Sequence, residues 1–222
     1  MVLAIVPCAW AERYAALVID ADSGRILYER FAQDPRHPAS LTKMMTLYMV
    51  FDALERGKLR LHQRLSVSKE AASRPPSKLG LKAGETITVE QAIYALVTRS
   101  ANDVAAVIAE AMAGSETRFA QSMTRRARAL GMTRTTFRNA SGLPDTRQIT
   151  TAWDMATSQS TAAQSWPVLL VFFNAPLLFS QQRAPQSQPS ANNYAGTDGI
   201  KTGTFACRAI IWWLQCGAMG DA

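Results

Sequence analysis

The spacing of apolar residues near the N-terminus predicts a β-hairpin followed by a long helix. The apolar run 14–19 and the alternating run 25–31 flank residues 20–24, whose Asp, Ser and Gly favour a turn. From Ser40, apolar residues recur at steps of three and four until Gly57, which is typical of an amphipathic helix and its stop signal. The expected apolar face consists of Leu41, Met44, Met45, Tyr48, Met49 and Ala53.

Three more helices are expected in the middle of the chain. Thr88 and Gln91 have the spacing of a capping box at the start of the first. The second spans about 103–113, and Ser115 is placed to cap the third. Before them, the prolines and glycines of 58–87 predict a structured loop with short strands.

The last of these helices carries positive charge opposite its apolar stripe. The charged residues are Arg118, Arg125, Arg126 and Arg128. We interpret them as a solvated helix face, with binding to a polyanion as the alternative. The whole chain is basic as well, with 24 Lys and Arg against 17 Asp and Glu and a net charge of +7. Nucleic acid, an anionic membrane surface or an acidic polymer is therefore an allowed partner.

The N-terminus and the cysteines bear on where the chain acts. Residues 1–11 contain an apolar stretch followed by Ala-Trp-Ala, which has the small-x-small form of a signal-peptidase site. They predict a residual secretion signal, with a buried first strand as the alternative. The three cysteines, Cys8, Cys207 and Cys216, are too few for a disulfide framework. No apolar run reaches the roughly 18–20 residues that a membrane-spanning helix needs.

The first motif with candidate chemistry pairs a serine with a lysine. Ser40 and Lys43 are one turn apart at the start of the predicted long helix. Free backbone N–H groups and the helix dipole favour a developing anion there. A neutral Lys43 could take the proton of Ser40 and make its hydroxyl a nucleophile. A second copy of this spacing, Ser66 and Lys69, lies in the loop region and is interpreted as accidental.

Two further motifs follow along the chain. Ser100 and Asn102 lie between two predicted helices, where a cap and a turn are the default interpretation. Lys201, Thr202 and Gly203 lie on a predicted strand. Lysine and threonine there can bind a carboxylate, and the glycine allows a ligand to approach the backbone. Each motif is weak evidence by itself.

Together the three motifs resemble those of a known superfamily. Ser-x-x-Lys, Ser-x-Asn and Lys-Thr-Gly in this order characterise penicillin-binding proteins and class A β-lactamases. The chain further resembles the low-molecular-mass D-alanyl-D-alanine carboxypeptidases of the serine peptidase S11 type. The stretches that carry this resemblance are 21–27, 38–44, 81–85, 100–103, 142–145 and 198–203.

The resemblance implies an α+β fold of the β-lactamase/transpeptidase type, with an antiparallel sheet flanked by a helical cluster. It also implies an acyl-enzyme mechanism in which Ser40 attacks a peptidoglycan stem peptide and Lys43 is the base. Burial and the positive charge of Lys201 are expected to favour the neutral amine of Lys43. Ser100 would relay a proton to the leaving amine, and Asn102 would hold the substrate amide.

The same resemblance implies how the rest of the substrate is held. Lys201 and Thr202 would bind the terminal carboxylate beside Gly203, and the backbone N–H groups of Ser40 and Thr204 would form the oxyanion hole. β-Lactams are expected to acylate Ser40 as inhibitors. No metal, cofactor or nucleic-acid partner is implied.

Two other functions stay open. A β-lactamase needs a deacylating carboxylate between the second and third motifs. The only glutamates after Ser100 are Glu110 and Glu116, both in predicted helices near the second motif, so slow deacylation is expected and a carboxypeptidase is favoured. The other alternative is not an enzyme: an inactive penicillin-binding remnant, or a basic protein that binds an anionic polymer.

The composition changes abruptly after residue 157. From 158 to 197 the chain has no acidic residue and one basic residue, Arg183. We expect the catalytic domain to consist of 12–157 and 194–204, and the segments unlike the family to be 158–193 and 205–222. A shifted reading frame is the simplest hypothesis, and translating the coding DNA in the other frames tests it.

The consequences of that hypothesis concern folding and location. The C-terminal strands and helix of the fold would be incomplete, leaving an open sheet edge and an uncovered apolar face. A chain of this kind is expected to fold poorly and to be weakly active or inactive. The predicted signal implies export to the periplasm or cell envelope, and the sequence does not support attachment to a membrane.

Overall fold

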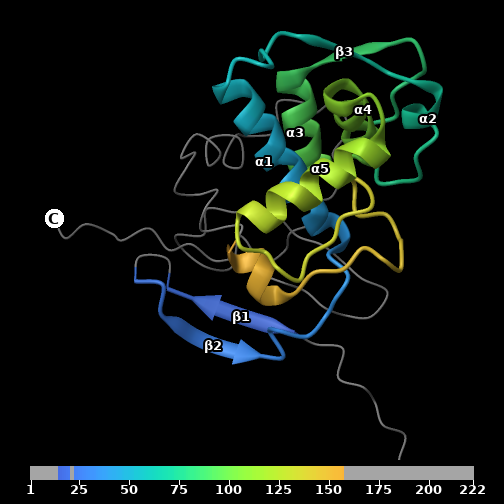
Figure 1. The fold of residues 1–222 in the computed structure, drawn as a ribbon. Helices are drawn as coiled ribbons and strands as arrows, with labels where there is room; N and C mark the ends of the chain where they lie inside the picture. Colours follow the sequence, from blue (N-terminus) through green and yellow to red (C-terminus); the bar gives the residue numbers. More distant parts are fainter. Residues whose placement is uncertain (1–14, 21–22, 158–222) are drawn as a thin grey trace, which may run out of the picture.

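A computed structural model describes residues 15–20 and 23–157 of the chain (Figure 1). Its first feature is an antiparallel hairpin of β1 (Ala16–Ile19) and β2 (Ile26–Arg30). The turn is closed by backbone hydrogen bonds from Asp20 N to Arg25 O at 2.8 Å and from Gly24 N to Asp20 O at 2.9 Å. The predicted hairpin is thus confirmed.

The long helix is preceded by a 3-10 turn. The turn is η1 (Ala39–Leu41), and α1 (Thr42–Glu55) continues directly from it. Gly57, with φ of +67°, follows the last turn as expected. The predicted apolar face, however, is too narrow. Residues outside it, among them Leu47, Val50 and Phe51, are also buried.

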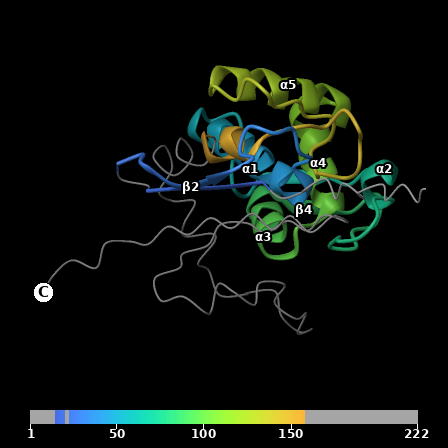
Figure 2. The ribbon, with the colours of Figure 1, turned by 90° about the horizontal axis from the view of Figure 1, so that it is seen from below.

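This wider burial has a simple cause, because α1 is the central helix of the cluster. It contacts α3 (Val89–Arg99), α4 (Asn102–Ala113) and α5 (Glu116–Ala129). Figure 2 shows α1 between α5 on one side and α3 on the other. A helix enclosed in this way buries polar as well as apolar positions, provided that the polar groups find partners.

The helix boundaries after α1 follow local signals. Thr88 and Gln91 form the predicted capping box at the start of α3, and the Ser115 side chain caps α5 by accepting from Arg118 N. Gly114, in the left-handed region with φ of +74°, ends α4. These predictions are confirmed. The apolar stripe of α5 is buried through Phe119, Met123 and Ala127.

The loop between α1 and α3 contains short elements, as predicted. Strand β3 (Arg64–Ser66) pairs antiparallel with β4 (Thr86–Thr88). Between them lies α2 (Lys69–Ala72), whose N-terminus is capped by Ser68. The segment after α2 runs back toward the N-terminus of α4, where Ser77 O accepts from Asn102 N at 2.8 Å.

The segment after α5 joins the helical cluster to the hairpin. Backbone bridges pair Arg36 with Thr150 and Thr136 with Ile149. The helical turn 152–157 then packs beneath the hairpin, in a small apolar cluster made of Ala15, Leu17, Ala32, Ala152 and Ala156. Hairpin, helical cluster and connecting segment agree with the predicted α+β class. The predicted strand that carries Lys201, Thr202 and Gly203 lies outside the described residues.

No helix in the described ranges is long and apolar enough to cross a membrane.

Candidate active site

The candidate site contains a fully buried lysine, Lys43, on the first turn of α1. Its Nζ donates to two neutral oxygens. One is Asn102 Oδ1 at 2.8 Å, and the other is the carbonyl oxygen of Ser141 at 2.5 Å. The first motif and the second, 59 residues apart in sequence, are thus joined by a direct hydrogen bond.

Asn102 is held in place by bonds on both sides of its amide. Besides accepting from Lys43, it donates from Nδ2 to Pro75 O at 2.9 Å. It is the first residue of α4 and is only 6% exposed. A role of Asn102 in a cap or turn does not account for these side-chain contacts. They fix the orientation of its amide between Lys43 and Pro75.

Ser100 occupies the turn between α3 and α4. It is the C-cap of α3 in the left-handed region, with φ of +52°. Its Oγ is buried and has no hydrogen-bond partner among the described residues. Buried hydroxyls are normally hydrogen-bonded, so an orphaned one beside Asn102 is a candidate for contact with substrate.

Ser40 lies in the 3-10 turn before α1 and is half-buried. The residue before it, Ala39, has a positive φ of +46°. The Ala39 peptide packs directly against Gly142, where a Cβ would overlap the Ala39 carbonyl and lie 3.0 Å from Ser40 N. The hydrogen bonds described for the Lys43 side chain go to Asn102 and Ser141 and not to Ser40, and catalytic hydrogen bonds are often long in sites without substrate.

A pocket of about 110 Å³ opens beside this turn. It is lined by residues just before Ser40 and by the 142–148 segment, including His37, Gly142 and Asp145. Arg147 donates from Nε and Nη2 to Asp145 at 3.2 and 3.0 Å. These bonds hold the pKa of the Asp145 carboxyl below its usual value.

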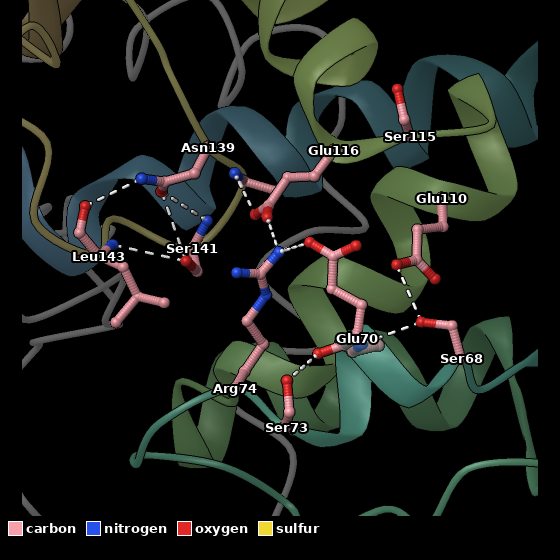
Figure 3. Close-up of polar contacts among 12 residues, drawn as sticks. Ser68, Glu70, Ser73, Arg74, Glu110, Ser115, Glu116, Asn139, Ser141 and Leu143 are labelled. Carbon is pink, nitrogen blue, oxygen red and sulfur yellow. Dashed lines mark hydrogen bonds and ion pairs between the residues drawn. The ribbon is translucent and has the colours of Figure 1, made fainter.

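The turn 139–143 supplies contacts that sequence reasoning missed. Asn139 Oδ1 accepts from Gly142 N at 2.7 Å, and Asn139 Nδ2 donates to Leu143 O at 2.9 Å (Figure 3). This turn presents Ser141 O to Lys43. The stretch 142–145 carries part of the family resemblance, but the contact with the lysine comes from the residue just before it, Ser141. Lys43 and Ser141 are 98 residues apart, and no local pattern reveals their contact.

Asp103 is a second missed residue. It is fully buried, and its carboxylate accepts four backbone N–H groups. Leu79 and Val104 donate to Oδ1, both at 2.9 Å, and Gly80 and Leu81 donate to Oδ2 at 2.8 and 3.2 Å. Its place in the stretch 100–103 was the only available signal. The carboxylate fastens the 79–81 loop to the start of α4, next to Asn102.

The remaining candidates separate into two groups. Lys201, Thr202, Gly203 and Thr204 lie outside the described residues. Ser66 and Lys69 are both exposed, on the end of β3 and the start of α2. No group of three or more His, Cys, Asp and Glu side chains in the described ranges could hold a metal ion.

Three of the four α5 arginines, Arg118, Arg125 and Arg128, are exposed, which agrees with the predicted solvated face, and Arg126 is the exception. Arg126 is half-buried, pairs with Asp52 of α1 and stacks over Tyr48 with its guanidinium carbon 5.3 Å from the ring centroid. Arg128 donates to Met132 O at 2.5 Å. The charge of Arg126 is therefore used between helices, because the α5 surface beside its apolar stripe packs on α1.

The sequence matches a known family along most of its length. The D-alanyl-D-alanine carboxypeptidase family model matches residues 9–209. DacF of Bacillus subtilis, a D-alanyl-D-alanine carboxypeptidase, is 30% identical over 198 residues, which are 86% of this chain and 51% of that protein. DacC of Escherichia coli is 33% identical over 200 residues, 86% of this chain and 50% of that protein.

Solved structures show the same fold. Penicillin binding protein 5 of Haemophilus influenzae superposes with a TM-score of 0.80 and 26% identity, covering 86% of this chain and 57% of that one. Penicillin-binding protein D2 of Listeria monocytogenes, in its ampicillin-bound form, gives 0.72 and 27% identity, covering 88% and 80%. These are penicillin-binding proteins of the β-lactamase/transpeptidase fold, as predicted.

The chain spans about half the length of the curated relatives it matches. The match nevertheless includes all three motif regions, and the described part has the fold of the solved relatives. The chain belongs to the D-alanyl-D-alanine carboxypeptidase family of serine peptidases, S11.

Proposed function

We propose that the chain is a serine-type D-Ala-D-Ala carboxypeptidase that removes the terminal D-alanine from peptidoglycan stem peptides. One observation carries the proposal: Lys43 is fully buried one turn after Ser40, with Nζ bonded to Asn102 and to Ser141 O. Because burial disfavours a charged ammonium and both oxygens are neutral, this environment suits a lysine that accepts a proton.

The acylation step uses the first two motifs. Ser40 Oγ attacks the carbonyl carbon between the two D-alanines while its proton passes to Lys43 Nζ. The new C–O ester bond forms as the C–N bond breaks, and the departing D-alanine amine receives a proton through Ser100, whose buried Oγ is unpartnered among the described residues. Water then attacks the ester, releases the shortened peptide and restores Ser40.

Substrate binding is assigned to both halves of the chain. We propose that Asn102 holds the substrate amide and that Lys201 and Thr202 bind its terminal carboxylate, with Gly203 allowing close approach. The backbone N–H groups of Ser40 and Thr204 would stabilise the oxyanion. β-Lactams, which present an acyl donor of similar shape, would acylate Ser40, and ampicillin is the molecule bound to the Listeria relative.

The hydrogen bonds of Glu110 and Glu116 favour a carboxypeptidase over a β-lactamase. Glu110 accepts from Ser68 Oγ at 2.9 Å. Glu116 accepts from Ala140 N and from the Arg74 guanidinium. Both glutamates that follow Ser100 are thus engaged in structural bonds, which supports slow deacylation. Rapid, continuous hydrolysis of a chromogenic cephalosporin would overturn this assignment.

Release of D-alanine from an N-acylated L-lysyl-D-alanyl-D-alanine peptide tests the activity. The full chain should release one D-alanine per peptide, and Ser40→Ala should lower the rate at least 10³-fold. Ser66→Ala, in the accidental copy of the motif, is the matched control and should keep the rate. Equal release by Ser40→Ala would contradict the proposal. A cooperatively folded chain that releases none would favour the inactive remnant.

The place of action is part of the same proposal. The 1–11 segment, with its signal-like pattern, and a polymeric substrate outside the inner membrane support export to the periplasm or cell envelope. Recovery of the chain from the cytoplasmic fraction of its own host, with residues 1–11 intact, would contradict it.

A further inference from the structure

A closed ring of hydrogen bonds passes through the candidate catalytic lysine. It runs from Lys43 Nζ to Ser141 O, then along the chain to Ala140, whose N–H donates to Glu116 Oε1 at 2.9 Å. Glu116 Oε2 accepts from Arg74 Nη2 at 2.6 Å. The ring then returns along the chain from Arg74 to the next residue, Pro75.

The last two bonds close the ring. Pro75 O accepts from Asn102 Nδ2 at 2.9 Å, and Asn102 Oδ1 accepts from Lys43 Nζ at 2.8 Å. Glu116 thus binds both Ala140 and Arg74. The residues that follow these two in the chain, Ser141 and Pro75, supply the carbonyl oxygens that hold Lys43 and Asn102. Ala140 is fixed on its other side as well, because Thr46 Oγ1 donates to Ala140 O at 2.7 Å.

The Arg74–Glu116 pair is the one ion pair in this ring, and its surroundings make it a strong bond. The two side chains are 23% and 11% exposed. Figure 3 shows the guanidinium between Glu116, which reaches toward the 139–143 turn, and Glu70. Charge-assisted bonds are shorter and roughly twice as strong as neutral ones, and partial burial reduces their screening.

We propose that Arg74 and Glu116 are positioning residues, which lock the 74–75 and 140–141 segments so that their carbonyl oxygens hold Asn102 and Lys43 in the geometry for acylation. This inference rests on the proposed function. Neither side chain is assigned contact with substrate. Their effect passes through Pro75 O and Ser141 O, so their loss should slow the chemical step far more than it weakens the first, non-covalent binding of a β-lactam.

A second carboxylate that binds the Arg74 guanidinium offers a matched control. Arg74 Nη2 also donates to Glu70 Oε1 at 2.8 Å, but Glu70 is 70% exposed and lies outside the ring. Glu70→Gln and Glu116→Gln therefore make the same chemical change to two carboxylates that bind one guanidinium. Exposed ion pairs contribute little, so only the second change should matter.

The test is the time course of labelling of the full chain by a fluorescent penicillin. The first-order acylation constant and the half-saturating concentration are separated by varying the penicillin. Glu116→Gln and Arg74→Met should lower the acylation constant about 10–100-fold and change the half-saturating concentration less than about threefold. Glu70→Gln should stay within about twofold. The double variant should be no slower than the slower single, because both changes break one bond.

A purely structural role gives a different result. Glu116→Gln and Arg74→Met would then lower the labelled fraction at saturation and the free energy of unfolding, and the molecules that still label would react at the normal rate. That outcome, or an equal effect of Glu70→Gln, would overturn the proposal. Arg74→Lys, which keeps the charge, should recover part of the acylation constant.

A second readout needs no reaction and separates this inference from the proposed function. Hydrogen exchange of the Asn102 side-chain amide, followed by NMR and assigned with Asn102→Asp, should accelerate at least about tenfold in Arg74→Met and Glu116→Gln but not in Glu70→Gln. A chain that shows this pattern without labelling by penicillin supports the ring and contradicts the proposed function. A chain that labels but shows no difference in exchange contradicts the ring.

Discussion

The helical cluster and the β1–β2 hairpin bury their apolar side chains to very different extents. Leu96 of α3 and Val104 of α4 are fully buried. In the hairpin, by contrast, Val18 is 46% exposed and Leu27 is 53% exposed. Of the six large apolar side chains exposed in the described ranges, five lie on or next to the hairpin strands: Val18, Ile26, Leu27, Tyr28 and Phe31.

This difference separates the helical cluster, which carries the first two motifs, from the hairpin. The helical cluster encloses its own core and holds Lys43 and Asn102 in direct contact. The hairpin is joined to the rest through the small alanine-rich cluster beneath it. A stable helical part can therefore keep the first two motifs together, and any folding defect of the chain should be concentrated in the sheet. The expectation of poor folding stays a prediction, now confined to that region.

Gly142 packs directly against the Ala39 peptide, and among substitutions outside the three motifs Gly142→Ala should have the largest effect on function. The new methyl group would overlap the Ala39 carbonyl and displace the turn that carries Ser40. We expect the acylation constant for a fluorescent penicillin to fall at least about 100-fold.

Gly57→Ala is the control for this substitution. Gly57 has a positive φ of +67°, as Gly142 has one of +86°, but nothing lies within 4 Å of the position that a Cβ at residue 57 would occupy. It should lose about 1–2 kcal/mol of unfolding free energy from backbone strain and keep the acylation constant. If Gly142→Ala behaves like Gly57→Ala, the 142 turn does not position Ser40.

Leucine-to-alanine substitutions measure the difference in burial directly. Leu96→Ala should lower the free energy of unfolding by about 2–5 kcal/mol, because it leaves a cavity in a closed core. Leu27→Ala should change it by less than about 0.5 kcal/mol, as expected for an exposed side chain. Both values come from urea denaturation of the full chain. A large loss in Leu27→Ala would show that another part of the molecule covers the hairpin.

The pKa of Tyr48 reports on how well the contact between α1 and α5 excludes water. We expect it to change stability less than the leucine substitutions do. Burial raises the pKa of the Tyr48 phenol above its usual value of 10.0, and the Arg126 guanidinium opposes the shift. Because the folded-state pKa is the higher one, the stability that Tyr48 contributes is complete below pH 10 and is lost as the pH rises through the folded-state value.

NMR titration of the tyrosines, with Tyr48→Phe for assignment, measures this shift. Arg126→Gln removes the opposing charge and should raise the pKa of Tyr48 further. A Tyr48 that titrates at or below its usual value would mean that the α1–α5 contact is open to water.

Local sequence patterns predicted the features that depend on neighbouring residues. The hairpin turn, the Thr88 capping box and the Ser115 cap all depend on residues a few positions apart, and the structure has all three. The spacing of Ser40 and Lys43 predicted a helix that starts near Ser40, and the structure places Ser40 in η1 and Lys43 in the first turn of α1. The apolar stripe of α1 was predicted too narrow, because neighbouring helices on several sides also bury Leu47, Val50 and Phe51.

What the sequence did not indicate depends on partners far apart in the chain. Asp103 meets backbone groups 22 to 24 residues earlier, and Arg74 meets Glu116 across 42 residues. Nothing in the neighbourhood of either residue marks it. The family resemblance includes Asn102, but it does not include Ser141 and Pro75, whose carbonyl oxygens hold Lys43 and Asn102.

The central claim is that Ser40 is the nucleophile of a site built around Lys43. Mass spectrometry of the full chain after incubation with penicillin tests it most directly. We expect an adduct of one penicillin, located by peptide mapping on Ser40, absent in Ser40→Ala and retained in Ser66→Ala. An adduct on another residue, or a cooperatively folded chain that forms none, would show that Ser40 is not the nucleophile.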